Sequence, residues 1–139
     1  MRDDTGSLKE LAKYRLKIAN EDLNTAKKNM EAGDYRAANN RAYYAIFHAI
    51  DACLALENKA FKRHGQAIGA FNRDYILPGI FPKDFGRRIN EAEEIRRKSD
   101  YDDFYIVSVE KTKKQVEFAQ DFLDKINEYV LKRIEEENR

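Results

Sequence analysis

An arginine and a histidine seven residues apart stand out in the segment 39-NNRAYYAIFHAID-51, which is otherwise largely apolar and aromatic. Seven residues make two helical turns less about 20°, so Arg41 and His48 share one face of a helix, with Tyr44 between them. A guanidinium binds phosphate through paired hydrogen bonds, and an imidazole exchanges protons near neutral pH. This pair could therefore hold a phosphate group and move a proton beside it.

Two interpretations of the pair are open from spacing alone. In the structural interpretation, Arg41 pairs with a carboxylate such as Asp100, and His48 is a core histidine with satisfied hydrogen bonds. In the functional interpretation, both side chains face a cleft between helices or between subunits. A cleft that reaches Arg41 and His48 would favour function, whereas burial inside one subunit would remove the basis for it.

Small and large side chains divide the rest of this helix into two faces. Alanines extend the face of Arg41 and His48 and allow another backbone to approach closely; they are Ala37, Ala38, Ala45, Ala52 and Ala55. The opposite face is predicted to lie in the core and carries Tyr43, Ile46, Phe47, Ile50 and Leu54. Aromatic residues of this face, and Phe118 and Phe122 further on, are assigned to packing and to no ligand.

Three further groups of polar residues are candidates for binding. His64 lies at a predicted turn, either as an exposed loop histidine or as a contact to phosphate or to the catalytic base. Basic clusters at 87–88 and 96–98 flank several glutamates, which is typical of a solvated helix face with i,i+4 ion pairs. If that helix instead lines a cleft, Arg96 or Arg97 could contact RNA phosphates. Asp100 and Tyr101 could then complete a hydrogen-bond network to Arg41, with Tyr44 beside it.

Composition narrows the classes of protein. The 139 residues are 42% hydrophobic and 37% charged with net charge +1, which fits one globular domain without general attraction to polyanions. We expect a single domain over 1–139, with its core at about 8–130 and a polar C-terminal tail. One cysteine, Cys53, and a polar N-terminus favour a reduced, cytoplasmic setting without a membrane span. Neither a metal site nor a cofactor motif is expected.

Apolar periodicity predicts an all-α protein, an up-and-down antiparallel bundle of three long and two shorter helices. The helices are expected at 7–32, 35–57, 64–76, 83–99 and 108–136. Ser7 is the expected N-cap of the first helix, Gly33 its stop, and Asp34 the N-cap of the second. Both prolines lie in the predicted turn 77–82, and residues 100–107 form a connector.

Three segments together resemble the HEPN domains, in particular the small stand-alone bacterial and archaeal members. They are 41-RAYYAIFHAI-50, 62-KRHGQAI-68 and 96-RRKSDYD-102, in the family's order along the chain. The resemblance covers about residues 8–130 and implies a helical bundle that often dimerises. It also implies that many members are metal-independent ribonucleases built on an R-x(4–6)-H motif, whose longest form Arg41 and His48 match.

The resemblance leaves two functions open. In the first, the chain is a homodimeric, toxin-type ribonuclease in which dimerisation brings two motifs together around a cleft. In the second, it is a non-catalytic module that binds a nucleotide or docks a small nucleotidyltransferase, as in several toxin–antitoxin pairs. The sequence departs from the ribonuclease pattern at Ala42, where members usually carry Asn, Asp or His. It also has Ile50 where some toxin members carry a modified tyrosine.

Overall fold

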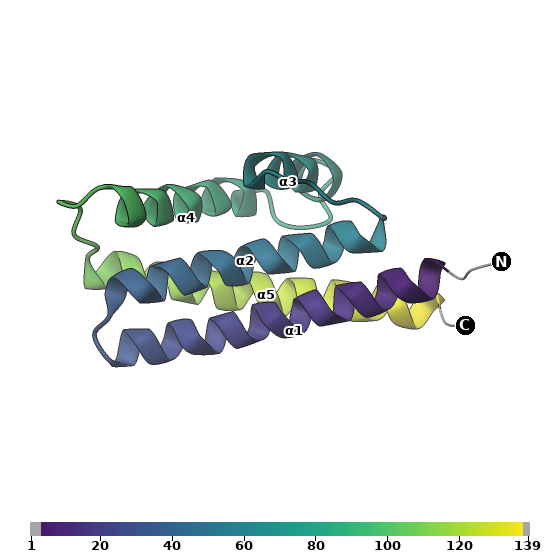
Figure 1. Ribbon diagram of the computed structural model, residues 1–139. Helices are drawn as coiled ribbons and strands as arrows, with labels where there is room; N and C mark the ends of the chain where they lie inside the picture. Colours follow the sequence, from purple (N-terminus) through teal and green to yellow (C-terminus); the bar gives the residue numbers. More distant parts are fainter. Residues whose placement is uncertain (1–3, 138–139) are drawn as a thin grey trace.

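The computed structural model describes residues 4–137, which form five α-helices and no strand (Figure 1). The helices are α1 (Asp4–Glu31), α2 (Tyr35–Leu56), α3 (His64–Phe71), α4 (Asp84–Tyr101) and α5 (Val109–Glu137), and the π-helical turn η1 (Asn72–Ile76) extends α3. None of the described helices is both long and apolar enough to cross a lipid bilayer. The predicted all-α bundle of three long and two shorter helices is therefore confirmed.

Helix α2 is the centre of the bundle, because α1, α3, α4 and α5 all contact it. Figure 1 shows the long helices α1, α2 and α5 side by side, with α3 and α4 above α2. The α1–α2 turn lies at one end of the bundle, together with the connector from α4 to α5. A helix in this central position is covered on most sides, as the apolar character of its sequence predicts.

The α1–α2 hairpin is formed by the two predicted turn residues. Gly33 adopts φ +80°, and the backbone N–H of Asp34 donates to the carbonyl of Asn29 at 2.9 Å, which closes the end of α1. The carboxylate of Asp34 then accepts a hydrogen bond from the backbone N–H of Ala37 at 3.2 Å and caps α2. The N-cap predicted at Ser7 is wrong, because α1 already begins at Asp4.

The middle of the chain also follows the predicted order. The helix expected over 64–76 is present, but its last turn widens into a π-helix in which the N–H of Leu77 donates to the carbonyl of Asn72 at 2.8 Å. The turn at 77–82 has Gly79 at φ +87°, a conformation that favours glycine. Helix α4 runs two residues further than predicted and includes Asp100 and Tyr101, so the connector begins at Asp102.

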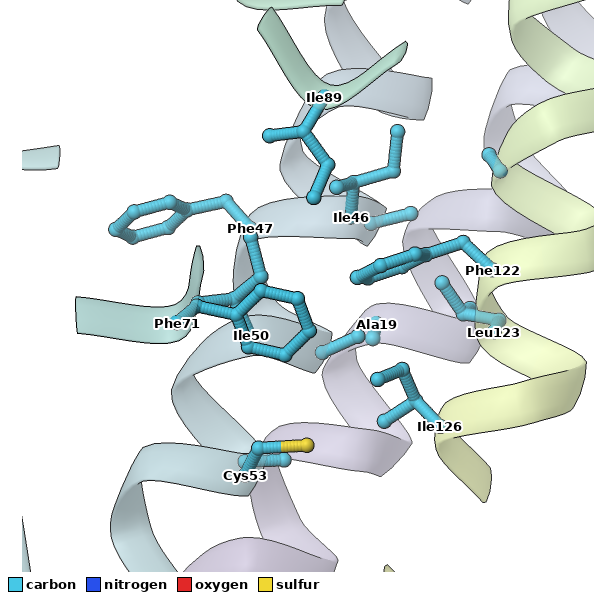
Figure 2. Packing of buried hydrophobic residues seen from close by; sticks show 14 of the residues in the cluster. Ala19, Ile46, Phe47, Ile50, Cys53, Phe71, Ile89, Phe122, Leu123 and Ile126 are labelled. Carbon is cyan, nitrogen blue, oxygen red and sulfur yellow. The ribbon is translucent and has the colours of Figure 1, made fainter. Parts of the chain in front are cut away.

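The core lies between α2 and its neighbours (Figure 2). Alanines of α1 and α2 are fully buried at their interface, namely Ala12, Ala19, Ala26, Ala38, Ala45, Ala49 and Ala52. Their small side chains allow the two backbones to lie close together, as the alanine pattern predicts. Larger side chains such as Ile46, Ile50 and Phe122 fill the space toward α5. Cys53 is fully buried among them, and burial raises the pKa of its thiol.

Candidate functional site

Arg41 and His48 lie on the same side of α2, and one carboxylate from α1 contacts both. Asp22 Oδ1 accepts a hydrogen bond from Arg41 Nη1 at 3.1 Å, and Asp22 Oδ2 lies 3.6 Å from His48 Nε2. The side chains of Arg41 and His48 are 38% and 32% exposed, whereas that of Asp22 is 14% exposed. Asp22 therefore links the two residues from the buried side and leaves both within reach of solvent.

Tyr44 lies between two arginines on this surface. The guanidinium carbon of Arg41 is 5.3 Å from the centroid of its ring, and that of Arg96, from α4, is 5.8 Å away. The Arg96 guanidinium also lies 5.0 Å from the ring of Tyr43 and donates a hydrogen bond to Asp100 at 3.2 Å. These cation–π contacts hold two positive charges near one tyrosine, an arrangement suited to binding an anion.

His64, the first residue of α3, lies over the aromatic side of α2. Its ring stacks on Phe47 with centroids 3.8 Å apart, and its Nδ1 is 2.9 Å from the hydroxyl of Tyr43. Burial raises the pKa of Tyr43 to about 12, so its hydroxyl stays protonated and can donate to Nδ1. Burial, assisted by the charge of Arg96, lowers the pKa of His64. Both effects favour the neutral imidazole of His64, and a proton on Nε2 leaves Nδ1 free to accept from Tyr43.

Two shallow grooves make the candidate site accessible. One, of about 420 Å³, is lined by Asn29, Asp34, Arg36, Ala37, Asn40, Arg41 and Asp100. The other, of about 410 Å³, is lined by Leu11, Tyr14, Arg15, Ile18, His48 and Asp51. Arg41 and His48 are therefore not sealed inside the subunit, which is the condition that the functional interpretation required.

Asp51 adds a second carboxylate on the His48 side. It pairs with Arg15 at 3.1 Å, and its pKa is raised because burial outweighs the opposing charges of Arg15, His48 and His64. Asp51 stands at the end of the segment singled out by sequence, yet neither it nor Asp22 was predicted as part of the site. Ala19 of α1 is buried, and Asp22 lies three residues further on, on the same side of the helix. This spacing is the signal in the sequence that could have predicted Asp22 as part of the site.

Two predicted contacts differ in the structure. The hydrogen-bond network from Asp100 and Tyr101 to Arg41 is wrong, because Asp100 pairs with Arg96 and Tyr101 is exposed to solvent. Arg41 instead bonds to Asp22 and to the amide oxygen of Asn40, at 2.9 Å. The physical reason is that Arg96 of α4 lies against Tyr43 and Tyr44 of α2 and takes Asp100 as its partner.

Arg97 lies on the outer side of α4. It pairs with Glu93 at 3.8 Å and does not contact the residues of the candidate site. Arg96, the other arginine considered, is the one beside Tyr44. Among the described residues, no group of three or more His, Cys, Asp or Glu side chains could hold a metal ion.

This arrangement has the parts that phosphoryl chemistry needs. Arg41 has guanidinium N–H groups beyond the two bonded to Asp22 and Asn40, and these can donate to a phosphate. The imidazole of His48 is close enough to solvent to exchange protons with a bound molecule. The carboxylate of Asp22 orients both groups, as a shared anchor should.

The family of the chain follows from comparison with known proteins. The model of the HEPN domain matches residues 12–133, and the chain belongs to this family. A UPF0332 protein of Thermotoga maritima is 31% identical over 87% of this chain and 92% of its own. Two proteins of Methanocaldococcus jannaschii, each named "Putative toxin", are 36% and 25% identical. They cover 68% and 78% of this chain, and 70% and 79% of their own lengths.

Proposed function

We propose that this protein is a toxin-type HEPN endoribonuclease with Arg41 and His48 as its catalytic residues. One observation carries the proposal: both side chains are open to solvent on one face of α2, and the Asp22 carboxylate holds both. The names of the two archaeal relatives support a toxin-like role. Net charge +1 implies that RNA would be recognised through a local cluster of cations, such as Arg41 and Arg96 around Tyr44.

The chemistry follows from the roles of the two side chains. The carboxylate of Asp22 favours a proton on His48 Nε2, which leaves Nδ1 free to accept the proton of an RNA 2′-hydroxyl. The 2′-oxygen attacks the adjacent phosphorus, and the bond from phosphorus to the 5′-oxygen breaks. Arg41 stabilises the charge that develops on the phosphoryl oxygens. An imidazolium donates a proton to the departing 5′-oxygen, giving a 2′,3′-cyclic phosphate and a 5′-hydroxyl.

The proposed active form is a homodimer in the cytoplasm. Two copies would place two sets of Arg41 and His48 around one cleft, so one histidine could act as base and the other as acid. The shallow grooves of a single copy support this form, because a catalytic site needs more enclosure than either groove supplies. No cofactor is part of the proposed reaction.

The test is cleavage of a labelled RNA by the parent protein and by His48→Ala. We expect the variant to lose about 10²–10⁴-fold in rate, the usual contribution of a general base or acid. Lys125→Ala, an exposed change on α5, is the matched control and should cleave as the parent does. Equal cleavage by His48→Ala and the parent, with both proteins folded, would refute this mechanism.

A second candidate function is a non-catalytic module that binds a small nucleotidyltransferase or a nucleotide. Ala42 favours it, because this residue is buried and places no polar group beside Arg41. At the position of the modified tyrosine of some toxin members, this chain has Ile50, which is buried in the core. A partner enzyme could not modify a side chain at this position without local unfolding, so such a partner would act by binding. Co-purification with a nucleotidyltransferase, together with no RNA cleavage by the free protein, would favour this function over the first.

A further inference from the structure

A groove between α4 and the beginning of α5 gathers positive charge away from the Arg41–His48 site. Its volume is about 580 Å³, and its lining includes Arg87, Arg88, Lys98, Lys111 and Lys114, with Glu91, Glu94, Ile95, Tyr105 and Gln115. The lining thus holds five cations and two carboxylates, on a chain whose net charge is only +1. This concentration of charge is the local patch that binding a polyanion requires.

The two carboxylates of this groove are already paired. Glu91 pairs with Arg87, and Glu94 with Lys98 at 3.0 Å. Within the described part of the chain, the three remaining cations, Arg88, Lys111 and Lys114, form no direct ion pair, although the charge of Lys111 helps Lys98 to lower the pKa of Glu94. The Arg88 guanidinium lies 4.3 Å from the ring centroid of Phe118, so it is fixed in place without being neutralised.

Lys111 and Lys114 lie in the first two turns of α5. Positive side chains at this end of a helix oppose the helix dipole, which favours anions there. Glu110 in the first turn offsets part of this unfavourable placement, and a further anion beside the two lysines would be favourable.

Gln115 supplies an independent observation. Its side chain is only 7% exposed and lines the groove, and its Oε1 is buried without a hydrogen-bond partner. An unpaired buried polar atom is costly and calls for a partner. Gln115 also lines the groove, and its amide NH₂ is the group that can donate to a phosphate there.

Exposed aromatic and apolar side chains lie next to the groove. The connector from α4 to α5 protrudes at one end of the bundle (Figure 1). There Phe104 is 93% exposed and Ile106 88%, and Tyr101, the last residue of α4, is 77% exposed. Tyr105 of the same connector lines the groove. A positive groove flanked by exposed aromatic rings is the arrangement by which proteins bind single-stranded nucleic acid.

We propose that the α4–α5 groove and its connector bind single-stranded RNA as an exosite of the enzyme. Arg88, Lys111 and Lys114 contact phosphates, and Phe104 and Tyr101 stack on bases. This inference rests on the proposed ribonuclease function, and it names the form of the substrate. The substrate is an RNA strand several nucleotides long, held outside the reactive site.

The connector joins the exosite to the candidate active site. Arg36 Nη2 donates a hydrogen bond to the backbone carbonyl of Tyr105 at 3.1 Å. Arg36 also lines the groove of Arg41, while Tyr105 lines the α4–α5 groove. A strand that leaves the exosite across the connector therefore reaches Arg41 without crossing another helix. This continuity explains why aromatic side chains would be exposed at this end of the bundle.

The first test measures binding without cleavage. The probe is a fluorescent 2′-O-methyl oligoribonucleotide of about twelve nucleotides, within the size range of single-strand sites, which cannot be cleaved because it lacks free 2′-hydroxyls. We expect Phe104→Ala to weaken binding about tenfold, in the range of one lost stacking contact. We expect the logarithm of the association constant to fall less steeply with the logarithm of salt concentration in the double variant Lys111→Ser/Lys114→Ser. The slope should become shallower by about 1.4, for two lost phosphate contacts.

The matched control is Lys125→Ser/Lys132→Ser, which removes the same charge from exposed positions further along α5. It should leave affinity and salt slope as in the parent. Parent-like binding by Phe104→Ala and by Lys111→Ser/Lys114→Ser would overturn the exosite. An equal loss of affinity in the control double variant would also overturn the exosite, because the loss would then come from the lower overall positive charge and not from the groove. Tighter binding of a poly-glutamate peptide than of the RNA probe would overturn it as well.

The second test separates this inference from the proposed function. The loss of probe binding caused by Phe104→Ala should be the same in a His48→Ala background as in the parent. The exosite variants should cleave a dinucleotide at the parent's rate but a twelve-nucleotide RNA more slowly. If the parent binds the probe through Lys111 and Phe104 but cleaves nothing, the catalytic proposal fails and RNA binding stands. If His48→Ala abolishes cleavage but the groove variants bind the probe as the parent does, only the exosite proposal is refuted.

Discussion

The two sides of α2 show how one helix can be both the centre of a core and the base of a polar site. On one side, Ile46 and Ile50 are fully buried and face Phe122 (Figure 2). On the other, Arg41 and His48 are about one-third exposed, and a single carboxylate holds them. The apolar side fixes the position of the helix, so the polar side needs few contacts to orient its side chains. Stability and activity should therefore depend on different sides of α2.

The largest expected effect tests the apolar side. Ile50→Ala removes a fully buried side chain from the middle of the core and leaves a cavity. We expect the free energy of unfolding to fall by about 2–5 kcal/mol, measured by chemical denaturation. His48→Ala, two residues away on the other side, is the matched comparison and should change the free energy of unfolding by less than about 1 kcal/mol. Similar losses in both variants would show that the two sides do not separate.

A smaller effect on stability is expected at the link between Arg41 and His48. Asp22→Asn keeps the shape of the side chain but removes the charge that both residues face. Because these partners are partly exposed, we expect a change in unfolding free energy of about 1 kcal/mol or less. RNA cleavage should fall by more than this stability change implies, because His48 and Arg41 lose their common anchor.

The control for this variant is Glu10→Gln, which breaks an exposed ion pair with Lys13 on the same helix. It should change neither stability nor cleavage by a measurable amount. If Asp22→Asn cleaves RNA at the parent's rate, Asp22 has no positioning role. The site would then consist of Arg41 and His48 alone.

The elements of the fold follow from local signals in the sequence. The alternation of three and four residues from Ala12 to Ala26 predicts the buried stripe of α1, and Gly33 and Asp34 predict the turn into α2. Each of these signals acts within a few residues of the chain. They could therefore be recognised without knowing how the helices are arranged in space.

The contacts of the candidate site depend on how separate helices are rotated against one another. Spacing places Arg41 and His48 on one face, since both belong to α2. It cannot choose Asp22 over Asp100 as the partner of Arg41, because either carboxylate could face α2 after a small rotation of its helix. The same limit applies to Arg96 and Arg97, which are adjacent in sequence but point to different sides of α4.

The smallest expected effect concerns His64, which lies on the aromatic side of α2. Its pKa is lowered by burial and by Arg96, although Asp51 and Glu93 oppose this effect. A histidine whose pKa is lowered by folding binds its proton at a lower pH in the folded state than in the unfolded chain. Stability is therefore lost as the pH falls through about 6.5, the ordinary histidine pKa, until the folded state is also protonated.

The measurement is an NMR titration of the His64 ring, in which we expect a midpoint below that of an unfolded histidine. Tyr43→Phe should move this midpoint upward, because the phenol O–H that occupies Nδ1 is lost and a proton can take its place. His64→Asn should reduce the loss of unfolding free energy between pH 7.5 and 5.5 relative to the parent. A His64 midpoint at or above the ordinary value would mean that Asp51 and Glu93 match or outweigh burial, and that His64 does not cause a loss of stability as the pH falls.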